Sequence, residues 1–179
     1  MTDLKKIIAI SGSTRASSTN LNLIKAIANL TTDRFDITIF EGLTELPHFN
    51  PDLDNAQPPE QITNFRNTLR KFDGILICTP EYAMGVPGTL KNAIDWTVSS
   101  MEFSRKPTAL ITASSVGQKG HSSLMETLKI IEAMITNETQ LLIPFAKTKI
   151  NSDCVITDDK TRIEIIQLLD SFHKIVSDK

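Results

Sequence analysis

The sequence predicts an α/β fold built on one doubly wound, five-stranded parallel sheet. Short apolar runs alternate with amphipathic stretches along the 179 residues, which is the pattern of repeated strand–helix units. Some of these runs are apolar at every position, so helices are expected to cover both faces of the sheet. For five such units we expect the strand order 2-1-3-4-5.

The expected strands and helices follow from these runs in chain order. The strands are expected at 5–10, 35–40, 74–78, 108–113 and 141–143. Apolar residues at helical spacing predict helices at 20–30, 60–72 and 89–98. Two more helices are expected in the segments marked by Leu124, Leu128, Ile131 and Ile135 and by Ile163, Ile166, Leu169, Phe172 and Val176. The Pro- and Asn-rich stretch 46–59 is expected to be a long loop inside one domain, 1–179, because the elements on both sides of it need the same core.

Composition and charge are those of an ordinary globular protein. The formal net charge is only -2, whereas a nucleic-acid or membrane surface would normally show as a basic excess. No apolar run approaches the roughly 20 residues that span a bilayer, and no basic region precedes a longer apolar stretch, so we expect no signal peptide. Cys78 and Cys154 form no metal or CxxC spacing. A cytoplasmic location is therefore expected.

The predicted strand order also predicts where a ligand binds. In an open parallel sheet the ligand lies beyond the carboxyl ends of the strands, where the winding direction reverses. That rule selects the loops after the first, third and fourth strands. These loops, at residues 11–20, 79–88 and 114–121, also hold the most unusual residues of the chain.

The loop 11–20 has the composition of a phosphate site. It reads Ser-Gly-Ser-Thr-Arg-Ala-Ser-Ser-Thr-Asn and leads into a helix, whose free N–H groups and dipole attract anions. Arg15 can donate two hydrogen bonds to a phosphate. One hydroxyl would be enough to cap the helix, so the cluster favours a phosphate monoester over a simple capped turn. The loop fits neither GxxxxGK[ST] nor GxGxxG.

The other two loops give weaker signals. The loop 79–88 holds two prolines that stiffen it, two glycines that let a ligand approach its backbone, and Tyr82, the only tyrosine of the chain. It fits a ligand contact or a rigid connector. The loop 114–121 is small and polar and fits a site or a flexible turn equally well.

These loops resemble those of the NADPH-dependent FMN reductases, a family that includes quinone, chromate and azo-dye reductases. The first loop is similar to the family motif GSxRxxSxN, with Gly12, Ser13, Arg15, Ser18 and Asn20 in register. The second is similar to PEYNxSxPGxLKNAIDW, over residues 80–82 and 87–96, and the stretch 46–53 looks like the family's loop after the second strand. The resemblance covers essentially the whole chain.

The resemblance implies a flavodoxin-like oxidoreductase with bound FMN and with NADPH or NADH as co-substrate. Hydride would pass to FMN and on to a small acceptor such as a flavin, quinone, chromate or azo compound. The residues implied to bind FMN are Ser11, Ser13, Arg15, Ser18, Thr19, Asn20, Pro80, Glu81, Tyr82, Ala83, Ser115 and Gly117. Ser13, Arg15, Ser18 and Asn20 would hold the phosphate, and 80–83 would lie along the ring. No catalytic residue and no metal is implied, and Glu81 would orient its loop.

The resemblance also implies a homodimer or homotetramer, with the apolar stretch 93–101 as the candidate contact. Trp96 is expected in the core or at that contact, and His121 is a weaker candidate for approaching the flavin. The chain departs from the family pattern at Ala83, where the family has Asn, at Gly85, where it usually has Ser, and at His121, where Gly is common. We expect FMN binding to be retained and the site to be more open to bulky acceptors.

Four other functions share parts of this pattern. A flavodoxin-like electron carrier would bind FMN without a nicotinamide site. Such carriers tend to be strongly acidic, and a net charge of -2 argues against this class. A response-regulator domain needs an acidic cluster after the first strand, and a low-molecular-weight phosphatase needs a cysteine in its phosphate loop. The loop 11–20 has neither. An interaction domain without enzyme activity stays open if Ala83 and Gly85 abolish flavin binding.

Overall fold

The computed structural model describes residues 4–178 and has the predicted strand order. Within that range five parallel strands form one sheet in the order β2-β1-β3-β4-β5. They are β1 (Lys5–Ser11), β2 (Phe35–Phe40), β3 (Gly74–Thr79), β4 (Thr108–Ala113) and β5 (Gln140–Ile143). Each strand lies within one residue of its expected bounds, and the flavodoxin-like α/β fold is confirmed.

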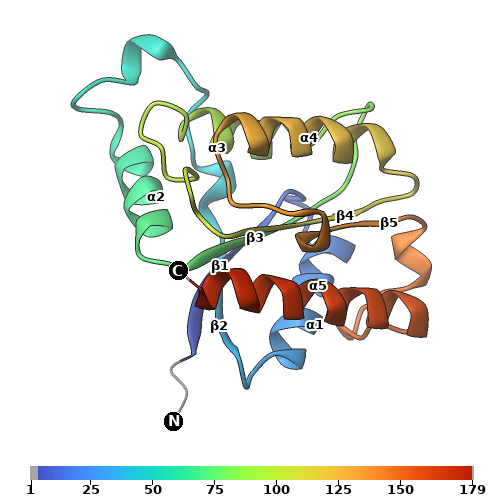
Figure 1. The fold of residues 1–179 in the computed structure, drawn as a ribbon. Coiled ribbons are helices and arrows are strands. Elements are labelled where there is room, and N and C mark those ends of the chain that lie inside the picture. The colour runs from blue at the N-terminus through green and yellow to red at the C-terminus, as the bar shows by residue number, and fades with distance from the viewer. Residues whose placement is uncertain (1–3, 179) are drawn as a thin grey trace.

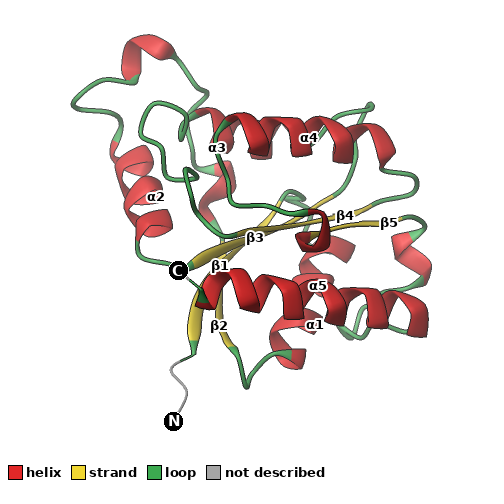
Figure 2. Cartoon of the chain, in the orientation of Figure 1, coloured by secondary structure: helices red, strands yellow, loops and turns green. Residues whose placement is uncertain are grey.

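Helices cover both faces of the sheet, which makes a three-layer arrangement (Figures 1 and 2). On one face lie α1 (Thr19–Leu30) and α5 (Asp159–Ser177), and on the other lie α2 (Glu60–Arg70), α3 (Gly88–Asp95) and α4 (Gln118–Ile130). No helix within residues 4–178 combines the length and the apolar character that crossing a membrane requires.

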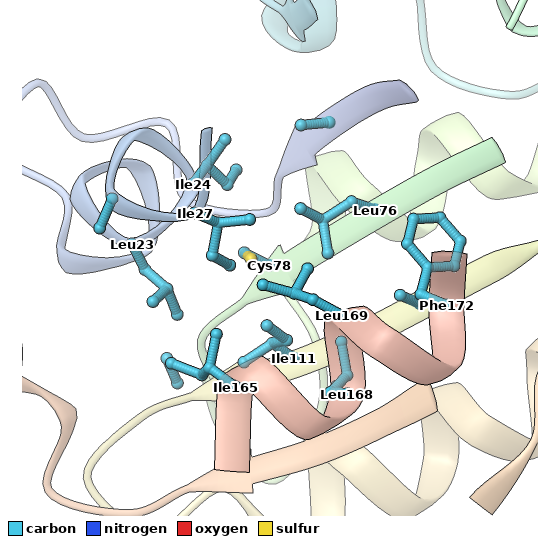
Figure 3. Close-up of a cluster of buried hydrophobic side chains, with 14 of the residues drawn as sticks. Leu23, Ile24, Ile27, Leu76, Cys78, Ile111, Ile165, Leu168, Leu169 and Phe172 are labelled. Carbon is cyan, nitrogen blue, oxygen red and sulfur yellow. The ribbon is translucent and has the colours of Figure 1, made fainter. Parts of the chain in front are cut away.

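Two cores form because successive side chains of a strand point to opposite faces. Leu76 and Cys78 of β3 pack with α1 and α5, as Figure 3 shows, whereas Ile75 and Ile77 pack with the helices of the other face. Burial raises the pKa of the Cys78 thiol, so this side chain stays protonated. Cys78 is therefore the buried small hydrophobe that its place in an apolar strand predicts.

Three helices end earlier than the spacing of apolar residues predicts. α4 ends at Ile130, and Glu132 follows with a left-handed φ of 61°. Ile131 and Ile135 still pack against the second core, but from the connection to β5. Likewise α2 ends at Arg70 and not at residue 72, and α3 ends at Asp95 and not at residue 98. At the ends of α2 and α4 the periodic pattern was wrong because irregular backbone also packs apolar side chains, such as Phe72, against the core. At the end of α3 the pattern counted Val98, which is exposed.

The long loop 46–59 is fastened to α3 by residues of the LKNAIDW motif. Asn92 Oδ1 accepts from Phe49 N at 2.7 Å, and its Nδ2 donates to Pro47 O at 3.0 Å. The indole Nε1 of Trp96 donates to the same carbonyl at 2.8 Å. Trp96 is fully buried, so it belongs to the core as expected and cannot make the subunit contact.

Candidate functional site

The loops after β1, β3 and β4 meet at one pocket of about 400 Å³, a size typical of small-molecule sites. The loop after β5 completes it. The lining residues are Ser13, Arg15, Ser18, Thr19, Asn20, Pro80, Glu81, Tyr82, Ala113, Ser114, Ser115, Phe145, Ala146, Lys147 and Thr148. The strand-order rule therefore selected the end of the sheet at which this pocket lies.

Most of the residues that the sequence indicated lie together at this pocket. Those that line it are Ser13, Arg15, Ser18, Thr19, Asn20, Pro80, Glu81, Tyr82 and Ser115. Three others lie outside the lining. Ser11 ends β1 and its hydroxyl donates to Ser13 O at 3.0 Å. Ala83 lies in a turn beyond Tyr82, and Gly117 precedes α4 with a left-handed φ of 92°.

The first loop leaves donors free at the N-terminus of α1. Ser18 caps the helix, since its Oγ accepts from Leu21 N at 3.3 Å. Within residues 4–178, no hydrogen bond involves the hydroxyls of Ser13 and Thr19, and Arg15 has neither a hydrogen bond nor an ion pair. The first turn of α1 holds no acidic residue. Capping therefore uses one side chain of the cluster and leaves the positive helix end uncompensated.

Asn20 lies at the same helix end and is nearly buried, with 3% of its surface exposed. Its Nδ2 donates to Ala113 O at 3.1 Å, which joins the first turn of α1 to the end of β4. Its Oδ1 is buried and has no hydrogen-bond partner among the described residues. A buried acceptor without a partner is costly unless a ligand supplies the donor.

Glu81 fastens the second loop to the third. Its backbone N–H donates to Ser114 Oγ at 3.2 Å, and its Oε2 accepts from the Gly120 N–H at 2.6 Å. A Cβ at position 120 would lie 2.9 Å from Gly85 O, so this close approach requires glycine. These contacts support the expected orienting role of Glu81.

Residues 145–148 form a fourth wall that the sequence analysis missed. The Phe145 N–H donates to Ser115 O at 3.1 Å, and the Ala146 N–H donates to Ser114 O at 3.0 Å. Phe145 has φ 55° and is 65% exposed, which is unusual for a bulky residue. The signal that could have found this wall is the carboxyl end of the fifth strand, which follows the same rule as the other three.

Comparison with known proteins decides the family. Residues 5–148 match the family of NADPH-dependent FMN reductases. The chain belongs to this family. It is 32% identical to an NAD(P)H-dependent FMN reductase of Pseudomonas aeruginosa, over 93% of this chain and 92% of that protein. It is 30% identical to a 2-hydroxy-1,4-benzoquinone reductase of a Burkholderia species, over 97% of each.

A solved structure supports the fold of this member of the FMN reductase family. The chain is similar to FerB, an NAD(P)H:acceptor oxidoreductase from Paracoccus denitrificans, with a TM-score of 0.83 and 24% identity. The similarity covers 98% of each chain. It extends beyond residue 148, where the family match ends.

The departure of the chain from the family pattern at Ala83 falls in a tight turn. Tyr82 N donates to Gly85 O at 2.8 Å and Gly85 N donates to Tyr82 O at 2.9 Å. The two residues at the tip, Ala83 and Met84, have φ of 49° and 64°. Asn tolerates this left-handed conformation better than Ala does. The left-handed backbone at position 83 therefore explains why Asn suits this position in the family pattern.

We expect Ala83→Asn and Ala83→Gly each to raise the free energy of unfolding by about 0.5–1 kcal/mol, because both relieve a left-handed alanine. Urea denaturation measures the change. Ala16→Gly is the control, since Ala16 is exposed and its φ is not positive. That change should give no gain. If neither variant at position 83 is more stable than the parent chain, this explanation of the turn is wrong.

His121 lies in α4, but it does not line the pocket of this family member. Its Nδ1 is 2.8 Å from Thr112 Oγ1, and its Nε2 bonds to the Gln140 side chain. Burial lowers the pKa of His121, although the hydrogen bond with Gln140 acts in the opposite direction. His121 thus joins α4 to β4 and β5, and its place outside the pocket lining gives no support to its expected approach to the flavin.

Proposed function

We propose that the chain binds FMN in this pocket and transfers hydride from NADPH or NADH to a small acceptor through it. The observation that carries the proposal is the uncompensated positive end of α1, with Arg15 beside it, in one pocket with apolar and aromatic walls. FMN when bound supplies the hydride chemistry. The protein needs only to bind it, orient it and leave one face open to the substrates.

The donor set of the pocket fits a phosphate and a polyhydroxyl chain. Ser13, Arg15 and Thr19 offer free donors for phosphate oxygens. Asn20 offers an unpaired oxygen, which accepts a hydrogen bond and therefore suits a hydroxyl of the ribityl chain better than a phosphate oxygen. This assignment differs from the family-based expectation, in which Asn20 contacts the phosphate.

The walls of the pocket suit a flat ring. Tyr82 is 48% exposed and comes from the loop after β3, and the exposed Phe145 comes from the loop after β5. Aromatic side chains of this kind gain contact area from a stacked ring. The carboxylate of Glu81 accepts a hydrogen bond from the Gly120 N–H. Glu81 therefore holds the loops together, and no acid–base step is assigned to it.

Arg15→Ala tests the phosphate assignment. We expect about 30-fold weaker FMN binding, because a hydrogen bond to a charged group contributes about 2 kcal/mol. Riboflavin lacks the phosphate, so its affinity should stay the same. Quenching of flavin fluorescence measures both. Arg162→Ala on the exposed face of α5 is the matched control and should leave both affinities unchanged. Unchanged FMN affinity in Arg15→Ala would exclude this phosphate site.

Reduction of the bound flavin tests the activity itself. The purified protein, loaded with FMN, should lose its flavin absorbance when NADPH or NADH is added without a second protein. An electron carrier of the same fold would not. Reoxidation by quinones, free flavin, chromate or azo compounds then ranks the acceptors. The homodimer or homotetramer and the cytoplasmic location stay predictions, and light scattering tests the first.

A further inference from the structure

We propose that Lys147, in the turn after β5, supplies a second cation, besides Arg15, to the phosphate of the bound flavin nucleotide. This inference rests on the proposed FMN site. Neither the family motifs nor the strand-order rule indicated Lys147. Three observations support this role of Lys147: the charge of the pocket, the place of the turn that carries the lysine, and the way in which that turn is held.

The first observation is the charge of the pocket. Arg15 and Lys147 are the cationic side chains among the described residues that line it, and Glu81 is the acidic one. Glu81 is bonded to Gly120. Within residues 4–178, Lys147 has no ion pair or hydrogen bond of its own side chain. A phosphate monoester carries about -1.5 to -2 charges near neutral pH. Arg15 alone leaves part of that charge unpaired, and a second cation matches it.

The second observation places Lys147 near the N-terminus of α1. Ile150 N donates to Ala146 O at 3.1 Å, so residues 146–150 form one helical turn that contains Lys147. The next residue, Asn151, accepts through its carbonyl from Asn22 Nδ2 at 3.0 Å. Asn22 lies in the first turn of α1. The turn after β5 therefore lies against the helix end that the phosphate loop enters.

The third observation is that the turn is held at both ends. On one side the amides of Phe145 and Ala146 donate to the carbonyls of Ser115 and Ser114. On the other side Asn151 is held by Asn22. Ala146, between them, is buried in the first core. A lysine on a fixed turn loses less freedom on binding than one on a mobile loop.

The experiment compares two flavins and matched lysine variants. Lys147→Gln should bind FMN about fivefold to tenfold more weakly than the parent, as expected for one partly exposed charge contact. Its riboflavin affinity should be unchanged. Lys147→Arg, which keeps the charge, should restore most of the FMN affinity. Lys25→Gln is the control. Lys25 is exposed on α1, more than one helical turn after the N-terminus of that helix, and it has no ion pair within residues 4–178. It should bind both flavins like the parent.

Each other outcome overturns the inference in a distinguishable way. If Lys147→Gln binds FMN like the parent, Lys147 is not a phosphate ligand, while the FMN site stands. If FMN and riboflavin weaken equally, the turn only shapes the pocket. If FMN affinity is unchanged and the KM for NADPH rises, Lys147 serves the nicotinamide nucleotide. If the parent protein binds neither flavin, the proposed function itself fails.

Discussion

Replacing Arg66 by alanine is expected to lower the free energy of unfolding by about 4 kcal/mol, within the range for removing one partner of a buried ion pair. Arg66 Nη2 lies 2.7 Å from Asp54 Oδ1, and the two side chains are only 8% and 10% exposed. Arg66 Nε also donates to Trp96 O at 2.8 Å. The substitution leaves a buried carboxylate and a buried carbonyl with fewer partners. Urea denaturation at pH 7 measures the loss.

The pH dependence of this loss gives a second readout. Burial raises the pKa of Asp54, but hydrogen bonds from Arg66 and Ser99 and the charge of Arg66 outweigh it, so the net pKa is lowered. A group whose pKa is lowered on folding stabilises the fold above its ordinary pKa, and this contribution is lost as the pH falls through the folded pKa. The difference in the free energy of unfolding between the parent protein and Arg66→Ala should therefore become smaller at acidic pH.

The control for this variant is Arg162→Ala, an exposed position at which we expect a change within about 0.5 kcal/mol. FMN affinity is also informative, because Asp54 and Arg66 do not line the pocket. It should be retained in Arg66→Ala at temperatures where the variant is folded. A stability loss below about 1 kcal/mol would show that the loop 46–59 does not depend on this ion pair.

The second large effect is expected from Gly12→Ala, at the start of the phosphate loop. A Cβ at this position would lie 2.3 Å from Thr79 Oγ1 and 2.8 Å from Thr79 Cβ. Thr79 is fully buried at the end of β3, so it cannot move into solvent. We expect a loss of about 3 kcal/mol in the free energy of unfolding, at the upper end of overpacking costs. FMN affinity should fall too, because the loop must shift.

Gly88→Ala is the matched control for this substitution. Gly88 begins α3, its φ is not positive, and a Cβ there would have no atom within 4 Å. That change should be neutral or stabilise the protein by about 0.5 kcal/mol, because it restricts the unfolded chain. Thermal melting of both variants separates the two cases. Equal melting temperatures would contradict the close packing of Gly12 against Thr79.

The central strands β3 and β4 could be predicted from the sequence because their apolar runs are nearly unmixed. β3 and β4 are buried at every position, and apolar residues fill most of both strands. The strand order then located the loops 11–20, 79–88 and 114–121 at one end of the sheet. β5 is different, because it is a short edge strand in which only Ile143 is buried. No motif follows it, so its carboxyl end, which lies at the same edge of the sheet, was the only signal for the wall at 145–148.

Contacts between distant segments account for most of what the sequence did not reveal. Asn92 and Trp96 stand in a motif of the reductase family, yet they hold Pro47 and Phe49, more than 40 residues earlier. Phe145 and Ala146 reach the pocket through Ser114 and Ser115. Spacing along the chain cannot indicate such pairs. The contact between Glu81 and Gly120, 39 residues later, is a pair of the same kind.

The turn between Tyr82 and Gly85 has a consequence for how such proteins diverge. Its two hydrogen bonds are internal, and Met84 at the tip is 74% exposed. A turn that closes on itself keeps its frame when its tip residues change, provided that they accept a left-handed backbone. Within that limit, changes at positions 83 and 84 should keep the frame of the loop from which Tyr82 lines the pocket. We expect a directed-evolution library at this pair to retain the fold, and its members can be screened for acceptor range.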